Sequence, residues 1–544
     1  MSQLETPAGI LGGVAVEANE RGKDARTAQS VLRRCFSFPV MLGGLLVSGV
    51  FCAARLGLQD PDTWWHIETG RRILTGAWPS VDPFSFTVAG KPWLPYEWLG
   101  DVVMALCARA GGLRGLTGGV LFFTSVLFLL LYYYGFLRSG NAKAAFLSCA
   151  CLLPLAVVFF TFRPQLIGYG FFALTLVLLE RYRQGLQKSL WALPVVFLLW
   201  VNTHGSFIFG LLALGLYVVC GMVNFREGDL EADLWRPEQL RHLALISALC
   251  VVALAATPYG IRVAINPIQM ALAQPVNIAN IKEWQPMPFG MWRGKLFLMI
   301  VLLTFLAQVA FRIRYRAAEL GLFLFAVYAA CVHVRFLVIF VIAVAPLLAM
   351  LLARWAPRYE ASQDHPILNA GLLALMAAAL VSFYPTQQAL EQTASQFFPI
   401  TAVRYLSNHP APQPMLNEYG FGGYLIWSSD GEHKVFIDGR ADIYEAGGVL
   451  SDYLAIMRLD PQALSLLDKY KIQSCLIQRD APLGTLLATQ PGWSRAYQDD
   501  ISALYVRSAE AEPPPYSARA DSAGGGEFRT VDVSESGGSA WGIE

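Results

Sequence analysis

The chain has 544 residues, of which 55% are hydrophobic and 15% charged, and its mean hydropathy is +0.44. Soluble domains carry about 25% charged residues, so this composition excludes an ordinary water-soluble protein and indicates one whose main solvent is the lipid bilayer. The net charge of +1 leaves no basic excess, which excludes nucleic acid as an expected partner.

The first 38 residues are polar and basic up to Arg33 and Arg34, and the first apolar run follows them. A cleavable signal peptide would carry its apolar stretch nearer the start, so we expect a cytoplasmic segment over 1–38 and a first membrane anchor that is retained. The nine cysteines form neither a disulfide framework nor a zinc-binding pattern.

Apolar runs able to cross about 30 Å of hydrocarbon recur along the next 350 or so residues. They lie near 39–57, 117–137, 143–161, 165–181, 189–202, 205–224, 241–257, 296–312, 317–333, 334–353 and 367–384. The sequence therefore predicts a polytopic α-helical membrane protein with about eleven transmembrane helices over 39–384. Its large first outer loop covers 58–116.

Basic residues mark the orientation of these helices, since short cytoplasmic loops hold an excess of Lys and Arg. They concentrate in alternate loops, near 138–143, 181–188, 226–241, 312–316 and 354–358. With an odd number of spans, this pattern predicts a cytoplasmic N-terminus and places the chain beyond Pro385 outside the cytoplasm.

The first outer loop opens with an acidic and aromatic segment from Gln59 to Arg72. Asp60 is suited to cap a helix and Pro61 to begin it, so Asp62 and His66 fall four residues apart on one helical face. Its apolar stripe comprises Trp64, Ile67 and Leu74. We expect an amphipathic helix at the membrane interface, anchored there by its tryptophans.

The acids of this loop are candidates for chemistry. Carboxylates held at a membrane surface suit a divalent cation such as Mg²⁺ or Mn²⁺ or can act as bases, and Asp60, Asp62 and Glu97 are the expected ligands. The alternatives are that Asp60 only caps the helix, Asp62 only favours the helix dipole, and Glu97 is a solvated residue at a helix start. With His66, these acids form the expected catalytic set.

Four further polar residues at the same side of the membrane are candidates for substrate binding: Arg163, His204, Glu283 and Arg335. A guanidinium binds phosphate in a bidentate manner, whereas the alternative is that both arginines reach lipid head groups. His204 lies in a tight turn, where a histidine commonly serves the backbone. Glu283 lies in the proline-containing 257–295 loop, expected to be an ordered, irregular lid.

Beyond 385 the pattern changes to short β-type runs near 434–437, 475–477 and 503–506, with helices near 448–457 and 461–470. This predicts a small α/β domain over 385–508 and a disordered, Gly/Ser/Pro-rich tail over 509–544. Glycine-containing stretches at 417–424 and 436–442 follow likely strand positions. We interpret them as structural turns, with an Asp438–Arg440 pair, in preference to a ligand site.

An acid-bearing loop after the first span, a membrane-parallel helix within it and an outward C-terminal domain together resemble the GT-C superfamily of polyprenyl-phosphate-dependent glycosyltransferases. The Asp-x-Asp-x-Trp-Trp-His start and the Phe-Ile-Asp-Gly-Arg-Ala-Asp stretch also resemble an uncharacterised group of bacterial membrane proteins. In the superfamily, an early acid of the first outer loop is catalytic or binds metal, and Asp60 or Asp62 matches that position. The Trp-Trp-Asp-Tyr-Gly motif of oligosaccharyltransferases is missing, which weakens the case for peptide asparagine as acceptor.

The resemblance implies a multi-pass protein of the bacterial inner membrane that moves a sugar from a polyprenyl-phosphate-linked donor to an extracytoplasmic acceptor. Its partners would be membrane lipid and the lipid-linked donor, while the acceptor and the sugar stay open. Two other functions are considered. A transporter or flippase of lipid-linked glycans would carry ionisable groups at mid-membrane and repeated halves. A non-catalytic scaffold of envelope assembly would tolerate loss of the acidic loop.

Overall fold

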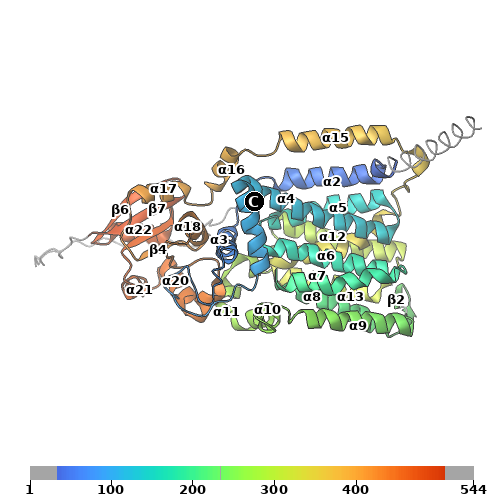
Figure 1. The fold of residues 1–544 in the computed structure, drawn as a ribbon, viewed down its shortest axis with the longest axis horizontal. Coiled ribbons are helices and arrows are strands. Elements are labelled where there is room, and N and C mark those ends of the chain that lie inside the picture. Colours follow the sequence, from blue (N-terminus) through green and yellow to red (C-terminus); the bar gives the residue numbers. More distant parts are fainter. Residues whose placement is uncertain (1–32, 233, 509–544) are drawn as a thin grey trace, which may run out of the picture.

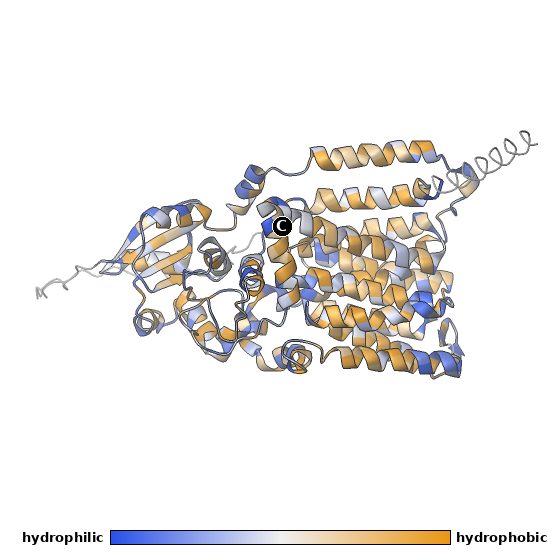
Figure 2. Cartoon of the chain, viewed as in Figure 1, coloured by the Kyte–Doolittle hydropathy of each residue, from blue (hydrophilic) through white to orange (hydrophobic). Residues whose placement is uncertain are grey.

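The computed structural model describes residues 33–232 and 234–508. A bundle of long, roughly parallel helices carries a smaller part of helices and strands at one end (Figure 1). The expectations for the tail 509–544, and for the cytoplasmic segment before residue 33, lie outside the described residues. In Figure 2 the bundle helices are largely hydrophobic, whereas hydrophilic residues gather at both ends of the bundle and over the smaller part.

Each of the eleven expected apolar runs is helical. The helices are α2 (Phe38–Ala54), α4 (Trp98–Ser139), α5 (Ala142–Ala156), α6 (Pro164–Arg183), α7 (Leu193–Val201), α8 (Phe207–Gly221), α9 (Pro237–Ala253), α12 (Trp292–Phe311), α13 (Ala317–Val332), α14 (Leu337–Leu352) and α15 (Pro366–Ser382). Short 3-10 turns adjoin three of them, η1 (Val157–Phe159), η2 (Gln187–Ala192) and η4 (Val334–Phe336), and a separate turn, η5 (Ala361–Gln363), precedes α15.

Among the described residues, four helical stretches are by themselves long and apolar enough to cross a membrane. They are Trp98–Ser139, Ala142–Phe159, Trp292–Phe311 and Val334–Leu352. A fifth is counted if α15 and α16 (Gln387–Ala394), which are bent by 63°, form one span. Other apolar helices are shorter, so the count of eleven and the predicted orientation stay predictions.

Helix α14 lies at the centre of the bundle, with nearly all of its residues buried. A helix that is apolar all round is the type found in the core of a bundle. Helix α4 packs against it and changes direction at Gly111 and Gly112, of which Gly112 has φ +57°. Glycine adopts this left-handed conformation without steric cost, so the break divides α4 into a short segment near the smaller part and a long segment in the bundle.

The helix expected in the first outer loop is α3 (Asp62–Leu74), and it packs against α4 and α18 (Tyr419–Ser428). Trp64 and Ile67 are buried as expected, but Leu74 is 44% exposed. The expectation that tryptophans anchor this helix to lipid is wrong. Trp64 instead packs against the rings of Phe398 and Trp427, because the C-terminal part folds back over the loop.

The C-terminal part contains a four-stranded sheet of order β4-β5-β7-β6, built from β4 (Met415–Asn417), β5 (Ser474–Gln478), β6 (Trp493–Gln498) and β7 (Ser502–Arg507). Strands β4 and β5 are parallel and the other pairs are antiparallel. The surrounding helices are α17 (Ile400–Asn408), α18, α19 (Ala441–Ala446), α20 (Val449–Met457), α21 (Ala463–Lys469) and α22 (Pro482–Thr489). The predicted small C-terminal domain with a sheet is therefore present.

Two local expectations for this part are wrong. The run 434–437 is no strand of the sheet, because Val435 pairs instead with Ser85 of the first outer loop in an isolated parallel bridge. The glycine-containing stretch 417–424 is mostly helical, since α18 begins at Tyr419. Glycines there let backbones approach closely: a Cβ on Gly423 would overlap the carbonyl oxygen of Pro61.

The 257–295 loop is more regular than the irregular lid that its prolines suggested. It contains α10 (Arg262–Ala273), α11 (Pro275–Asn280) and the turn η3 (Lys282–Trp284). Two of the prolines stand where a helix tolerates them, at its first turn or beyond its end: Pro275 begins α11, and Pro286 follows η3. Glu445 of α19 accepts hydrogen bonds from the free backbone N–H groups of Val276 and Asn277, which ties this loop to the C-terminal domain.

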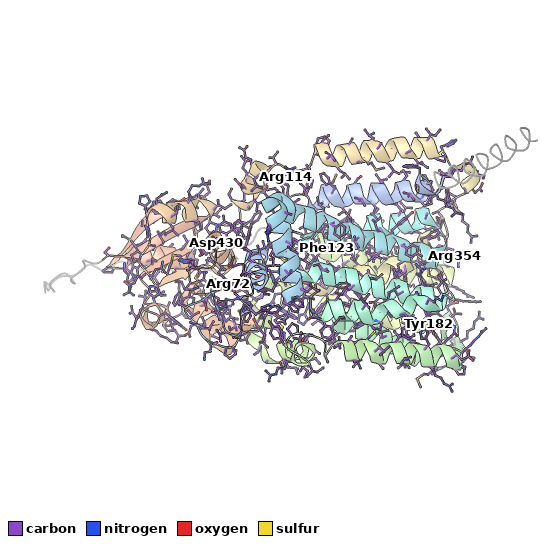
Figure 3. All side chains as sticks on the ribbon, viewed as in Figure 1. Arg72, Arg114, Phe123, Tyr182, Arg354 and Asp430 are labelled. Atoms are coloured by element: carbon purple, nitrogen blue, oxygen red, sulfur yellow. The ribbon has the colours of Figure 1, made fainter. Side chains whose placement is uncertain are left out.

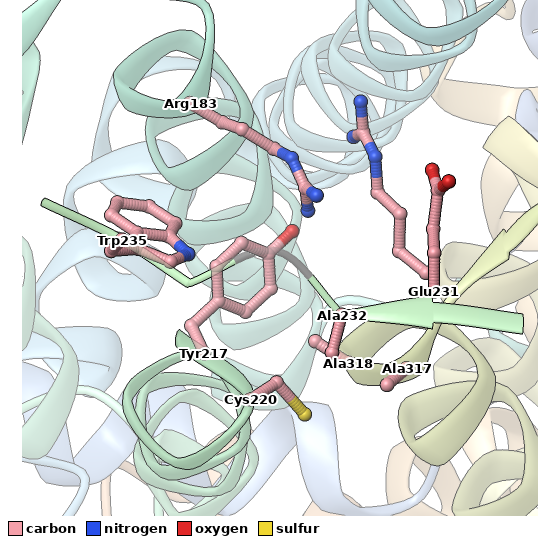
Figure 4. A pocket seen from close by; sticks show the side chains of 9 residues that line it. Arg183, Tyr217, Cys220, Glu231, Ala232, Trp235, Ala317 and Ala318 are labelled. Carbon is pink, nitrogen blue, oxygen red and sulfur yellow. The ribbon is translucent and has the colours of Figure 1, made fainter. Parts of the chain in front are cut away.

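At the opposite end of the bundle, β1 (Phe225–Glu227), β2 (Leu230–Ala232) and β3 (Tyr315–Arg316) form a small sheet. A cavity of about 10 Å³ lies beside it, lined by Arg183, Tyr217 and Trp235 among others (Figure 4). This volume holds about one water molecule. A larger groove of about 470 Å³ runs between α2, α4 and α15, with Arg114 and Tyr384 on its wall. Neither cavity is lined by the acids of the first outer loop.

Candidate active site

The guanidinium of Arg163 is held by three carboxylates from separate parts of the chain. Its Nε lies 2.7 Å from Asp60 Oδ2, its Nη2 2.5 Å from Asp62 Oδ2 and its Nη1 2.7 Å from Glu283 Oε1. Nη1 donates a hydrogen bond to Glu283. The contact between Nε and Asp60 is an ion pair whose geometry does not meet that of a hydrogen bond. The Arg163 side chain is only 17% exposed. We name these four residues the Arg163 cluster.

Local structure explains why these groups meet. The Asp62 N–H donates to Asp60 Oδ1 at 2.9 Å, which fixes both acids at the start of α3. The Thr63 hydroxyl donates to the Phe162 carbonyl at 3.0 Å, so the start of α3 is fastened beside Arg163. Arg163 is the extended residue immediately before α6, which begins at Pro164, a residue suited to the first turn of a helix.

A second polar group adjoins this cluster. His66 Nδ1 lies 2.5 Å from Asp101 Oδ1, and the Nε2 atoms of His66 and His204 lie 3.7 Å and 3.5 Å from the two oxygens of Glu97. Sequence reasoning selected His66, Glu97 and His204 but missed Asp101. Asp101 follows Glu97 by four residues at the start of α4, and this helical spacing is the signal that could have identified it.

Burial sets the charge states of these groups. It raises the pKa of Asp62 to about 7, helped by the negative Asp60 and Glu283 and opposed by Arg163. Burial also raises the pKa of Glu97 to about 8, against the attraction of Arg163 and Arg335. At neutral pH Asp62 therefore exchanges its proton readily and Glu97 holds one.

The two histidines carry no charge at neutral pH. Burial, together with the positive Arg335 and Arg163, lowers the pKa of His204 to about 3. Burial and the charge of Arg163 place the pKa of His66 well below its usual range. The contacts of both rings with Glu97 are therefore polar contacts between neutral groups and not salt bridges. In contrast, Arg163 lowers the pKa of Glu283 despite burial, so Glu283 is a charged partner.

Arg335 lies on the other side of Glu97 and differs from Arg163 in its partners. Its guanidinium stacks 4.1 Å from the centre of the Trp284 ring. Within residues 33–232 and 234–508 it forms no ion pair, although its charge acts on Glu97, His204 and Glu283. A half-buried guanidinium without a carboxylate partner is suited to bind an anion.

The C-terminal domain closes the site with the segment 436–442. Gly439 lies against Asp62, and a Cβ at this position would overlap Asp62 Oδ1. Tyr419 donates a hydrogen bond of 3.3 Å to the Gly439 carbonyl. Burial raises the pKa of Asp442, whose charge in turn acts on Glu97. Sequence reasoning missed these three residues as neighbours of the acids, because nothing local to 436–442 shows which surface it covers.

Arg440, in the same segment, has the structural role that the sequence suggested. It binds Asp438 through Nε at 2.8 Å and Nη2 at 2.6 Å, and Asp82 of the first outer loop through Nη1 at 2.6 Å. All three side chains are almost completely buried. A further contact joins these parts near Arg72 and Asp430, both labelled in Figure 3: Arg72 donates to the Gly431 carbonyl, and Arg71 forms an ion pair with Asp430. The loop and the C-terminal domain are thus joined at several points.

The expected metal ligands do not fit a common ion. Asp60 and Asp62 bind the Arg163 guanidinium, whereas Glu97 lies with the two histidines. Across the described chain, no group of three or more His, Cys, Asp or Glu side chains is arranged to hold a metal ion. A positive side chain stands where the carboxylates converge, so a divalent cation would have to displace it.

The fold was compared with solved structures, and the sequence with known families and proteins. No known family profile and no curated protein matches the sequence. The archaeal oligosaccharyltransferase AglB from Archaeoglobus fulgidus, solved with an inhibitory peptide and a dolichol-phosphate, is 11% identical with a TM-score of 0.45 over 87% of this chain and 74% of AglB. ArnT from Cupriavidus metallidurans, solved with undecaprenyl phosphate, is 14% identical with a TM-score of 0.47 over 87% of this chain and 99% of ArnT.

The chain is similar to these two structures in general arrangement alone. The superfamily that the first outer loop and the layout of the sequence indicate stays a prediction. At these TM-scores the likeness is one of general arrangement, and no residue role is transferred from either structure. The roles considered below rest on the distances and charges of this chain.

Proposed function

We propose that this protein is a membrane glycosyltransferase that moves a sugar from a polyprenyl-phosphate-linked donor to an acceptor hydroxyl outside the cytoplasm. The main support for the proposal is that a group able to accept a proton and a group able to bind an anion lie in the same site. Asp62, with its pKa raised to about 7, is poised to take a proton, while Arg335, whose charge acts on the neighbouring Glu97 and Glu283, forms no ion pair with the residues that the structure describes. A transferase that acts on a phosphate-linked sugar needs both.

In the proposed step, the acceptor oxygen attacks the anomeric carbon of the donor sugar. A carbon–oxygen bond forms between acceptor and sugar, and the bond between the anomeric carbon and the phosphate oxygen breaks. The hydroxyl proton passes to the Asp62 carboxylate, and the lipid phosphate leaves with the bonding electron pair. Atoms and charge balance without any further reactant.

The arginines stabilise the leaving phosphate. Arg335, which has no ion pair within the described part of the chain, offers its guanidinium nitrogens directly, whereas Arg163 contributes a fixed positive charge beside the base. Asp60 and Glu283 hold Arg163 in place, so their role is positioning. Holding reacting groups in a fixed geometry supplies a large part of catalysis in such reactions.

The second polar group is suited to position the acceptor. Glu97 is protonated at neutral pH and His66 and His204 are neutral, so the three side chains can donate and accept hydrogen bonds to a sugar or lipid hydroxyl. Asp101 fixes the His66 ring through its Nδ1 atom. It is thereby a positioning residue for the acceptor side of the site.

The place of the site favours transfer over transport. The candidate groups gather at the end of the bundle that carries the C-terminal domain, whereas transporters bind their substrates near the middle of the membrane. At the bundle end, the tail of a polyprenyl phosphate can stay in the bilayer while its head group reaches the arginines. We place the protein in the bacterial inner membrane with this end facing outward.

Mass spectrometry of lipids that co-purify with the full chain, followed by transfer assays with the identified donor, tests the proposal. We expect a polyprenyl-phosphate sugar to be retained by the wild type and transferred in its presence. Asp62→Asn should retain the lipid but lose transfer, and Asp430→Asn, which changes an exposed acid paired with Arg71, should behave as wild type. Equal transfer by wild type, Asp60→Asn and Asp62→Asn would refute the mechanism.

A further inference from the structure

Three carboxylates around one point are the arrangement that oxygen ligands make around a hard cation. In this protein Asp60, Asp62 and Glu283 converge from the first outer loop and from the segment after α11, but the point of convergence is the guanidinium of Arg163. Each acid meets a different nitrogen, so the carboxylates are spread around a planar, forked cation.

The contacts of Arg163 leave no room for a metal ion between the same acids. Metal–oxygen bonds of Mg²⁺ or Ca²⁺ measure about 2.0–2.6 Å, so ligand oxygens must crowd around one point. Here that point is filled by the guanidinium carbon and its nitrogens, and the surrounding side chains are mostly buried. An arginine is charged at every physiological pH, which makes it a permanent occupant.

The charge of the cluster explains why a cation is needed at all. Three carboxylates face one another within reach of a single guanidinium, and burial makes their mutual repulsion strong. Without a positive group at the centre, the acids would have to take up protons or separate. Arg163 supplies that charge from the chain itself, at the start of α6.

We infer that Arg163 takes the place of a divalent cation at this site, so that the protein works without a metal. The catalytic part of this inference rests on the proposed transferase function. Whether a metal ion binds among the three carboxylates can be measured without any sugar donor. In the proposed reaction the guanidinium neutralises charge beside the leaving phosphate, and Asp60 and Glu283 fix its position.

Binding of Mn²⁺ to the purified full chain, followed by electron paramagnetic resonance, tests this directly. We expect no saturable Mn²⁺ binding by the wild type at about 1 mM, and no shift of its thermal unfolding midpoint on adding the ion. In Arg163→Ala the three carboxylates lose their cation, so this variant should gain a Mn²⁺ site and be stabilised by the ion.

Matched variants separate this gain from a general effect of losing charge. Arg163→Lys keeps a positive group and should not gain Mn²⁺ binding. Arg335→Ala removes a guanidinium that pairs with no carboxylate in the described chain, so it should not gain binding either. Adding Glu283→Gln to Arg163→Ala removes one ligand and should weaken the new Mn²⁺ site at least tenfold.

Saturable Mn²⁺ binding by the wild type that Asp62→Asn abolishes would overturn the inference, even if Arg163→Ala proved too unstable to purify. Failure of Arg163→Ala, once folded, to gain Mn²⁺ would overturn it as well. If the ion measurements come out as expected but no sugar transfer is found, the proposed function fails and the assignment of Arg163 stands.

Discussion

Gly439 of the C-terminal domain lies directly against the carboxylate of Asp62 in the first outer loop, with no room for a Cβ atom between them. Two residues far apart in the sequence are thus in van der Waals contact at the centre of the proposed site. The wall that faces the candidate base belongs to the C-terminal domain, while the base itself belongs to the loop.

This contact predicts the effect of Gly439→Ala. The added methyl group would push Asp62 away from Arg163 and Trp65, its present partners. We expect transfer to fall on the order of a hundredfold, since displacements of about 1 Å have such effects, and stability to fall by about 1–3 kcal/mol. Gly290→Ala, where an added Cβ meets nothing within 4 Å, is the control. If Gly439→Ala transferred sugar as fast as the control, the contact between Gly439 and Asp62 would not matter for transfer.

Asp62→Asn separates charge from shape at the candidate base. Loss of the carboxylate should reduce transfer by a factor on the order of a hundred or more. In the wild type, transfer should rise with pH through about 7, where Asp62 loses its proton. A profile for residual Asp62→Asn activity that keeps the same rise would assign the titration to another group.

The same raised pKa predicts a change in stability with pH. Because the folded-state pKa of Asp62 lies above that of the unfolded chain, the folded protein holds this proton more tightly, and the resulting stabilisation is lost as pH rises from about 4 to about 7. Asn carries no such proton. The melting temperature of Asp62→Asn relative to wild type should therefore increase over this range, and a decrease would contradict the pKa direction.

Glu97→Gln tests whether the Glu97 carboxyl is protonated at neutral pH. Gln is neutral and can still contact His66 and His204, so stability at about pH 4, where Glu97 is protonated in the folded and the unfolded chain, should be close to that of the wild type. Because the unfolded chain loses this proton near pH 4.5 and the folded chain only near pH 8, the wild type should lose stability relative to Glu97→Gln as pH rises between these values, and the difference should stay constant above pH 8. Thermal unfolding at a series of pH values measures this, with Glu97→Ala as the variant that loses both contacts.

The buried pair of Arg440 and Asp82 predicts a large structural effect. Asp82→Ala leaves the Arg440 charge with Asp438 alone in an environment closed to water, and removing one partner of such a pair costs about 3–5 kcal/mol. Arg507→Ala breaks the exposed pair with Asp468 and should cost at most about 1 kcal/mol. Denaturant unfolding of the two variants in detergent compares them. Equal losses would mean that the buried network is not what joins the loop to the domain.

The predicted orientation is testable with reporter fusions. A reporter placed after Arg316 should be cytoplasmic and one placed after Arg507 extracytoplasmic, because the basic residues concentrate in alternate loops. A cytoplasmic signal from the second fusion would reverse the placement of the site and remove the access of an extracytoplasmic acceptor.

The sequence predicts helices well where the signal is local. The eleven apolar runs are all helical, and the spacing of Asp62 and His66 correctly placed a helix after Pro61. Both features depend on residues within one or two helical turns, so composition and periodicity are sufficient to reveal them.

Partners across long sequence distances were not predictable in the same way. Asp62 and Arg163 were both selected, but as metal ligand and phosphate binder, and their contact depends on how α3 packs beside the start of α6. The run 434–437 has the composition of a sheet strand, yet its Val435 pairs with Ser85 of the first outer loop and not with a strand of the sheet. Such contacts follow from tertiary packing, which no local pattern records.

The link between Asp82 and Arg440 also bears on how the protein is made. The two residues are 358 positions apart, so at about 5–20 residues per second the loop waits roughly 20–70 s after its synthesis before its partner is synthesised. Throughout that interval Trp65, Phe84 and Trp93, which later belong to the hydrophobic core of the C-terminal domain, lack their cover. The first outer loop would thus be translated early and be among the last segments to mature, and a chain terminated before Arg440 would present it, uncovered, to the quality-control proteases of the cell.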